Sequence, residues 1–289
     1  MVSPQVRRLC CLLRPASLVA VLACLLTASA SGDEITEQLL KNTGWGKFKP
    51  GAWQQVRVIV QALDPQGNVT ATTTTDRTTT LVGVDPQSVT LELAVTAEVA
   101  GKRFDAPIQF ITQGCHGEPS GQATEVRELT PTPSTIEGKT IVCRVREYQI
   151  SDQDQRRRVV VYYNRDVEPV VLRRRSEARS KDGDRQIVET SVDVISLNTP
   201  HKVKDTVMPS SVVRTVQKTD TTKISMTSVL VSEVPGGVVS SKSEERDVEG
   251  RIVRRTTLEL VDWGQEGEHW DERSPERRRE HRKQRRQGR

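Results

Sequence analysis

A strand–turn–strand unit occurs twice in the second half of the chain, and it constrains the fold more than any other feature. One copy covers residues 161–177 and runs on into a K-D-G-D-R turn; the other covers residues 229–244 and runs on into V-E-G-R. The glycines of the two turns, Gly183 and Gly250, are 67 residues apart, as are Glu177 and Glu244. A repeated hairpin predicts a long antiparallel sheet, because each copy adds two strands beside the last. It does not indicate a reaction.

Alternating apolar and polar side chains extend this prediction to most of the chain. The clearest case is residues 89–99, where Val, Leu and Ala alternate with Thr and Glu, so that one face is expected to be dry and the other wet. A fainter copy of the turn occurs at residues 64–68. Residues 113–138 are expected to be loop, because Gly, Pro, Ser and Thr interrupt the pattern there. The other expected strands are residues 56–62, 69–82, 140–150, 156–163, 170–178, 186–195, 212–219, 223–231, 238–246 and 252–261.

The predicted fold class is therefore mainly β, a long antiparallel meander of repeated hairpins that forms a half-open barrel or curved sheet. We divide the chain into a signal peptide (1–30), an N-terminal helix and connector (31–52), an antiparallel β domain with internal repeats (53–264) and a basic tail (265–289). The short helix is expected at residues 33–42. The tail is expected to be disordered, because it has almost no aliphatic side chain to bury.

The first thirty residues have the features of a secretory signal peptide. Three arginines precede an uncharged apolar run at residues 16–26, and Ala28 and Ala30 form a small-x-small cleavage site. We expect the mature protein to begin near Ser31 and to be exported, to the periplasm or the exterior. An alternative is a bacterial lipobox at residues 21–24, which would leave a lipid anchor on Cys24.

Removal of the signal peptide leaves two cysteines, Cys115 and Cys143. An even pair in an exported chain permits a disulfide between them. The alternative is a buried free thiol at Cys143, which lies between Ile141 and Val145 on an expected strand.

The basic residues are concentrated at the C-terminus. The formal net charge is +5, but the segment from 31 to 272 is mildly acidic. A specific nucleic-acid partner is therefore not expected, since the β domain has no net basic charge. The tail is instead a candidate for peripheral contact with an anionic surface. The residues expected to make this contact are Arg277, Arg278, Arg279, Arg282, Lys283, Arg285 and Arg286.

No motif for catalysis, metal binding or cofactor binding is found. The four histidines lack a second ligand at metal spacing, and the adjacent pair Cys115 and His116 suits neither a zinc nor a redox site. No Walker loop, dinucleotide fingerprint or nucleophile elbow is present. Two arginine triplets, residues 156–158 and 173–175, form either an anion-binding stripe or, as we favour, a solvated face neutralised by nearby carboxylates. We expect no cofactor and no enzymatic activity.

The succession of hairpins, with turns such as D-V-E-P at residues 166–169 and E-V-P-G-G at 233–237, resembles the lipoprotein-carrier superfamily of LolA/LppX-like half-open barrels. It also resembles uncharacterised exported bacterial proteins. The resemblance covers residues 45–263 and is architectural, so no binding residue is carried across. It implies a curved sheet whose concave side holds an acyl chain.

The expected function is therefore that of a non-enzymatic extracytoplasmic β-sheet protein that binds a lipid or another hydrophobic ligand. The alternative is a structural or interaction protein of the cell envelope, whose basic tail contacts anionic polymers or membrane. An apolar cavity of roughly several hundred Å³ between the sheet and the N-terminal segment would favour the ligand-binding function, whereas a filled core with an exposed flat sheet would favour the structural one.

Overall fold

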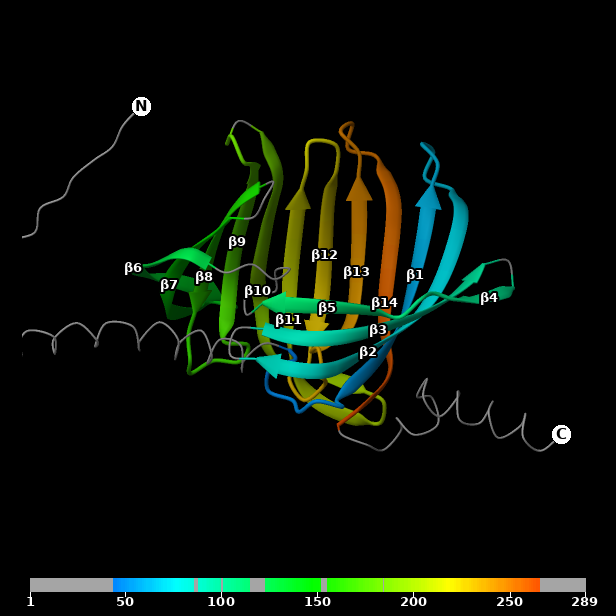
Figure 1. Cartoon of the computed structure of the whole chain (residues 1–289), viewed down its shortest axis with the longest axis horizontal. Coiled ribbons are helices and arrows are strands. Elements are labelled where there is room, and N and C mark those ends of the chain that lie inside the picture. The colour runs from blue at the N-terminus through cyan, green and yellow to red at the C-terminus, as the bar shows by residue number, and fades with distance from the viewer. Residues whose placement is uncertain are drawn as a thin grey trace, which may run out of the picture.

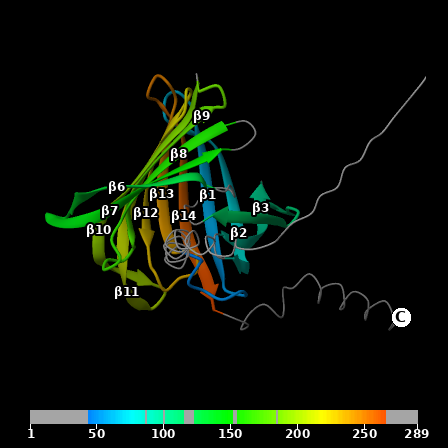
Figure 2. The ribbon, with the colours of Figure 1, turned by 60° about the vertical axis from the view of Figure 1, so that its left-hand side comes forward.

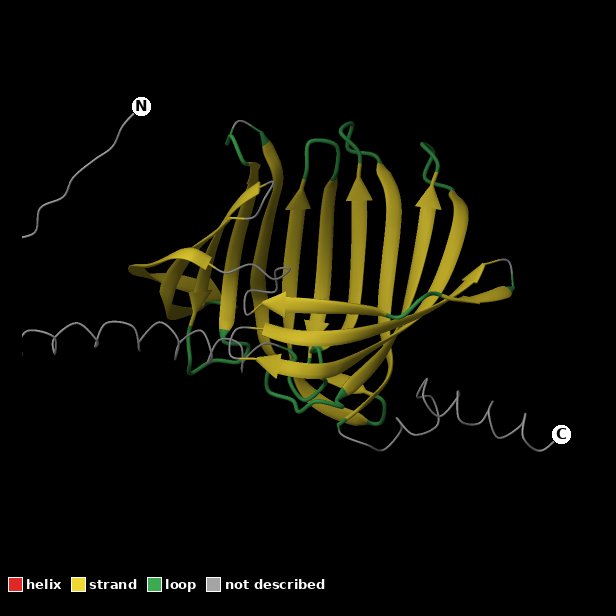
Figure 3. Cartoon of the chain, viewed as in Figure 1, coloured by secondary structure: helices red, strands yellow, loops and turns green. Residues whose placement is uncertain are grey.

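The computed structural model describes residues 44–85, 88–99, 101–114, 123–151, 155–183 and 185–265. The predicted signal peptide, the predicted helix at 33–42 and nearly all of the basic tail lie outside these residues. The described residues form strands joined by turns and loops (Figure 3). No helix among them is long and apolar enough to cross a bilayer. The strands are β1 (Trp53–Leu63), β2 (Val69–Asp85), β3 (Ser88–Val99), β4 (Lys102–Asp105), β5 (Gln109–Gly114), β6 (Ala123–Ile136), β7 (Lys139–Ser151), β8 (Gln155–Tyr163), β9 (Val171–Ser180), β10 (Gln186–Val203), β11 (Thr206–Lys218), β12 (Lys223–Leu230), β13 (Val238–Arg246) and β14 (Ile252–Gly264).

All fourteen described strands belong to one antiparallel sheet, in the order β4-β3-β2-β1-β14-β13-β12-β11-β10-β9-β8-β7-β6, with β5 also paired to β3. The sheet is open and curved, and β2, β3 and β5 cross in front of the wall formed by β10 to β13 (Figure 1). Figure 2 shows the two ends of the sheet on opposite sides of its central strands. The predicted mainly β meander is thus confirmed. Two pairings among the described strands are non-sequential: β3 with β5, and β1 with β14, which places Val58 opposite Leu258.

The expected loop at residues 113–138 is wrong over much of its length, because Ala123–Ile136 forms strand β6. Pro131 and Pro133 were the signal for a loop. They are tolerated because β6 lies at an edge of the sheet and pairs only with β7. An edge strand has no second neighbour, so the backbone N–H that proline lacks is not required there. The register also shifts between Leu129 and Thr132, next to the prolines. Proline therefore marked a sheet edge here, and not the end of a strand.

Strand β10 also differs from its prediction, since it continues to Val203 and does not end at residue 195. Its pairing with β11 shifts register twice between Val194 and Thr199. The strand continues past these two irregularities, and Pro200 lies opposite Pro209.

Three turns at hairpin tips share one geometry, and they are the turns that the sequence aligned. Their glycines, Gly67, Gly183 and Gly250, have φ of 85°, 84° and 81°. Each glycine N–H donates to the carbonyl oxygen three residues earlier, at 2.9 to 3.0 Å. Glycine is required because residues with a Cβ rarely adopt positive φ.

The first of these turns is held by a carboxylate. Asp64 accepts hydrogen bonds from the backbone N–H groups of Gln66 and Asn68, at 3.0 and 2.8 Å. The Asn68 side chain donates a further bond of 3.1 Å, and the bonds from Asn68 are the main cause that lowers the pKa of Asp64 below its usual 3.8.

A pH-dependent contribution to stability follows, because the folded state stabilises the ionised carboxylate of Asp64 more than the unfolded chain does. The contribution is present above the usual pKa of 3.8 and is lost as pH falls through the lowered pKa. We expect Asp64→Ala to lower the melting temperature at neutral pH, and the difference from the parent to vanish in strong acid. Differential scanning fluorimetry across this range measures it, and a constant difference at every pH would contradict it.

The core confirms the two-face pattern expected of residues 89–99. Leu91 lies opposite Leu81, and both are buried. They pack with Trp45 from the connector that precedes β1. Glu92 lies on the opposite face, paired with Thr80.

Candidate functional site

In the middle of the sheet the two faces differ in charge, whereas toward the β13–β14 turn the inner face carries the ion pair of Arg254 with Glu245. Strand pairing aligns an uncharged row across eight neighbouring strands, which we call the central row. The central row is Ala97, Thr75, Val58, Leu258, Ser241, Ser228, Val213 and Val194. The next row on the same face is also uncharged from β2 to β10. It consists of Thr73, Val60, Thr256, Ser243, Met226, Thr215 and Val192. We call the face that carries both rows the inner face.

The opposite, outer face is covered by ion pairs. On β1 and β2, Arg57 donates to both carboxylate oxygens of Asp76, at 2.8 and 3.1 Å. On β7 and β8, Arg158 donates to Glu147 at 2.9 and 2.5 Å, and this hydrogen bond holds the pKa of Glu147 below its usual value. Neutralised pairs of this kind are typical of a solvated sheet surface.

The two arginine triplets do not form one anion-binding stripe. Arg173 and Arg175 lie on the outer face, where both contact the same carboxylate oxygen of Asp193 at 3.0 and 2.9 Å. Arg174 lies on the inner face, between Val161 and Val192. The pleat of the strand thus divides the triplet, which fits our interpretation of a neutralised face.

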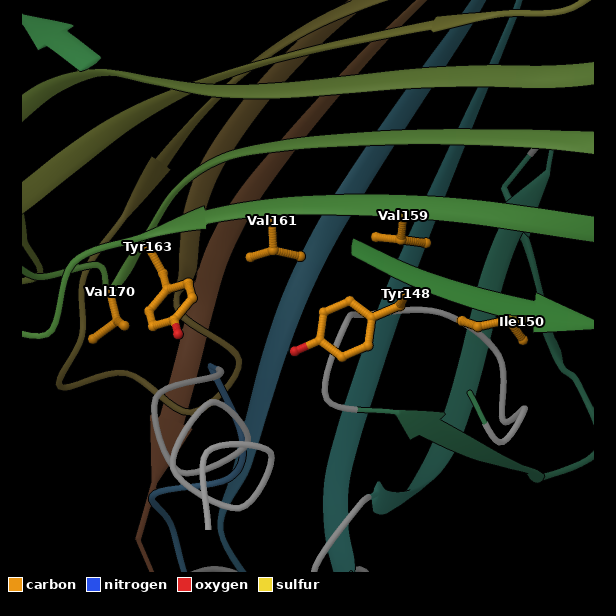
Figure 4. Packing of buried hydrophobic residues seen from close by; sticks show 6 residues of the cluster. All are labelled: Tyr148, Ile150, Val159, Val161, Tyr163 and Val170. Carbon is orange, nitrogen blue, oxygen red and sulfur yellow. The ribbon is translucent and has the colours of Figure 1, made fainter. Parts of the chain in front are cut away.

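On β7 and β8 the inner face is lined by large buried side chains. Tyr148, Ile150, Val159, Val161 and Tyr163 are all at most 5% exposed. Figure 4 shows them on one side of the two strands, with Val170 beside Tyr163 and with β1 and β14 behind them. This end of the inner face is therefore well packed, whereas the central row is half-buried at Val58 and Leu258.

Two arginines on the inner face are in contrasting surroundings. Arg146 on β7 is 4% exposed and donates to Oε1 of Glu128 at 3.2 and 2.5 Å. Burial lowers the pKa of Arg146, but the bond with Glu128 and the nearby tyrosines outweigh it, so that its pKa is raised. This is the usual arrangement for a buried guanidinium, which needs a carboxylate to offset the loss of water.

Arg77 on β2 has no such carboxylate among the described residues. It lies between Val56 of β1 and Val95 of β3. Its Nε is buried without a hydrogen-bond partner, and burial alone lowers its pKa. One row away, Gln54 lies opposite Thr79, and its Oε1 is also buried without a partner. The inner face thus holds an unpaired donor and an unpaired acceptor beside the central row.

A small pocket of about 180 Å³ lies where the connector meets the β12–β13 turn. Gly44 and Lys47 line it from the connector, and Glu168 and Ser211 line it from distant parts of the sheet. Lys47 Nζ forms an ion pair with Glu168 at 3.1 Å, and Glu233, the third charged residue that lines the pocket, accepts a hydrogen bond from the Ser232 hydroxyl. The ion pair links the connector to the segment between β8 and β9.

Of the site residues predicted from the sequence, the structure describes Cys143 but neither Cys115 nor the basic residues of the tail. Cys143 is buried, and burial raises the pKa of its thiol. Cys115 lies outside the described residues, so the disulfide stays a prediction. The basic residues of the tail, from Arg277 to Arg286, also lie outside them. In the described ranges no three His, Cys, Asp or Glu side chains are grouped as metal ligands would be.

The sequence reading missed Arg77 and Gln54. The strand predicted at residues 69–82 is rich in Thr, which hides the alternation along it. Counting back by twos from Leu81 places Arg77 on the apolar face of β2, and that is the signal that could have found it. The same count back from Val58 through Val56 places Gln54 on the apolar face of β1, but its contact with Gly236 from a remote turn has no local signal.

No family model matches the chain, and no curated protein matches it. Three solved bacterial structures are similar to it. A DUF1329 family protein from Desulfovibrio piger is 10% identical with a TM-score of 0.35, over 84% of this chain and 96% of that one. A candidate lipoprotein from Parabacteroides distasonis is 8% identical with a TM-score of 0.33, over 77% and 98%. A candidate exported protein with a YmcC-like fold, from Bacteroides fragilis, is 12% identical with a TM-score of 0.29, over 74% and 97%. Two of the three are thus described as lipoprotein or exported, the kind of bacterial protein that the sequence resembled. At these TM-scores the likeness assigns neither a ligand nor a compartment to this chain.

Proposed function

We propose that this chain is a non-enzymatic, extracytoplasmic binding protein whose inner face holds the apolar part of a lipid or a similar hydrophobic ligand. The observation that carries the proposal is the uncharged central row, which runs across eight strands of a curved sheet whose other face is covered by ion pairs.

The side chains of the central row suit an alkyl chain. Val58 and Leu258 are half-buried and leave apolar surface to cover. The hydroxyls of Ser228 and Ser241 hydrogen-bond to each other at 3.2 Å, so that their polar groups are satisfied without water or ligand. Each methylene group that a ligand buries on such a surface contributes about 0.8 kcal/mol. From β13 to β10 the row is already buried, with Ser241, Ser228, Val213 and Val194 at most 8% exposed, so the surface left to cover is the part from Ala97 to Leu258. Several methylene groups buried there give useful affinity without any polar contact.

The second candidate function, a structural protein of the envelope with a basic contact, depends on the tail. A structural protein of this kind is expected to bind no amphiphile on its inner face. Measuring uptake of an amphiphile therefore separates the two candidate functions.

Uptake of a neutral amphiphile tests the proposal with two matched variants of β1. Val58 and Ile59 are adjacent and both half-buried, but they lie on the inner and outer faces respectively. We expect 1-oleoylglycerol to displace Nile red from the parent protein. We expect Val58→Asn to weaken this displacement about tenfold, because an amide on the row must be desolvated, and Ile59→Asn to leave it unchanged.

Melting temperatures of both variants control for loss of structure. An equal effect of the two substitutions on displacement would contradict binding on the inner face. Absence of displacement from the parent protein would favour the structural alternative.

A further inference from the structure

We propose that Arg77 binds the anionic headgroup of the ligand, so that the ligand is a single-chain acid with a carboxylate or phosphate on an apolar tail. This inference rests on the proposed function and adds the class of ligand to it. It starts from a polar group that the fold itself leaves unsatisfied.

The surroundings of Arg77 favour an anion. Val56, opposite it on β1, is 1% exposed, and Val95 lies opposite it on β3. Both Arg77 and Arg146 bury a guanidinium nitrogen without a partner, but Arg146 is neutralised by Glu128, whereas Arg77 has no carboxylate beside it among the described residues. A desolvated cation is costly to keep unless a counter-charge reaches it. A guanidinium offers two parallel N–H groups, which match the oxygens of a carboxylate or phosphate.

The position of Arg77 relative to the central row fixes where the tail would lie. Arg77 follows Thr75 of the central row on the same face of β2, and Thr75 lies opposite Val58. A headgroup on Arg77 therefore places its tail at the start of the row that leads through Val58 to Leu258. Charge and apolar surface are adjacent, as recognition of an amphiphile requires.

Gln54 adds a second contact at the same place. It lies opposite Thr79, the next inner-face residue after Arg77 on β2, so Gln54 and Arg77 are diagonal neighbours, with Cα atoms roughly 7 to 8 Å apart. The Oε1 of Gln54 is buried without a partner and can accept a hydrogen bond from a hydroxyl on the headgroup or from a water molecule held by it. Gln54 and Arg77 thus leave an acceptor and a donor unpaired on neighbouring strands of the inner face.

The test compares oleate with oleyl alcohol, which differ in the headgroup alone, by displacement of Nile red. We expect the parent protein to prefer oleate at least about tenfold, the strength of a charge-assisted hydrogen bond. Arg77→Met should remove this preference and leave the affinity for oleyl alcohol unchanged. Arg57→Met is the matched control: it removes the same charge from the outer face, one residue from Val56, and should behave as the parent.

Five results would overturn the inference that Arg77 binds the headgroup. A preference that survives in Arg77→Met places the headgroup elsewhere. Equal losses in the Arg77→Met and Arg57→Met variants mean that net charge alone attracts oleate. Competition by acetate or inorganic phosphate as strong as that of oleate shows an anion site without a tail. Oleyl alcohol that binds without any preference for oleate overturns only this inference, whereas failure of both ligands to bind the parent overturns the proposed function as well.

Discussion

Replacing Gly236 with alanine is expected to lower the free energy of unfolding by about 3 kcal/mol, and the same change at Gly237 by only about 1 kcal/mol. The two glycines are neighbours in the β12–β13 turn and have nearly the same backbone conformation, with φ of 80° and 77°. The conformational cost of alanine is therefore the same at both. The difference comes from space. A Cβ on Gly236 would lie 2.5 Å from Nε2 of Gln54 and 2.9 Å from the Trp45 ring, whereas on Gly237 its nearest neighbour would be 3.9 Å away.

The contact is close because the connector is hydrogen-bonded to this turn. The N–H of Gly236 donates to the carbonyl oxygen of Gly44 at 2.7 Å, and a Cβ on Gly44 would lie 2.5 Å from the Gly236 oxygen. Urea denaturation of the two alanine variants measures the difference. Equal midpoints would mean that Trp45 and Gln54 move aside without cost, and that the connector is not packed tightly against the turn.

Replacing Leu91 with aspartate is expected to cost more than about 4 kcal/mol, which is enough to unfold a marginally stable domain, whereas Glu92→Lys should change stability by less than about 1 kcal/mol. Leu91 is 6% exposed and packs with Trp45, Leu81 and Val89, so its replacement buries an unpaired carboxylate. Glu92 is on the outer face of the same strand, next to Thr80.

The two variants differ by one position in sequence, so that they test the register of β3 directly. Far-ultraviolet circular dichroism in urea gives both midpoints. If Glu92→Lys were as damaging as Leu91→Asp, the assignment of faces along β3 would be wrong, and with it the position of Arg77 on the inner face.

Local patterns were sufficient to predict most strands, and the reasons are physical. Alternation along residues 89–99 reports which side chains are dry, and glycines such as Gly183 and Gly250 mark turns because few other residues adopt their φ. The same local reading failed at Pro131 and Pro133, because whether a proline is tolerated depends on the presence of a neighbouring strand, which the local sequence does not contain.

The candidate site was less predictable than the fold for a related reason. The central row becomes a continuous uncharged strip only when eight strands are aligned, and that alignment includes the pairing of β1 with β14 between opposite ends of the β domain. Arg77 stands out only once Val56 and Val95 are known to flank it. Pairwise register between remote strands is a long-range property, and a single sequence without relatives carries little signal for it.

The pairing of β1 with β14 also sets the order in which the sheet can be completed during synthesis. The first strand of the β domain ends up in the middle of the sheet, and its neighbour is the last strand to be made. Until Ile252–Gly264 is available, the hairpins of β1 to β3 and the meander of β6 to β13 are two separate sheets, each with an exposed edge that can pair with another chain. Closure by such a distant contact is slow, since the loop entropy is lost before the contact forms. A nascent chain of this protein therefore gains most from a partner that shields strand edges until the fourteenth strand joins the two halves.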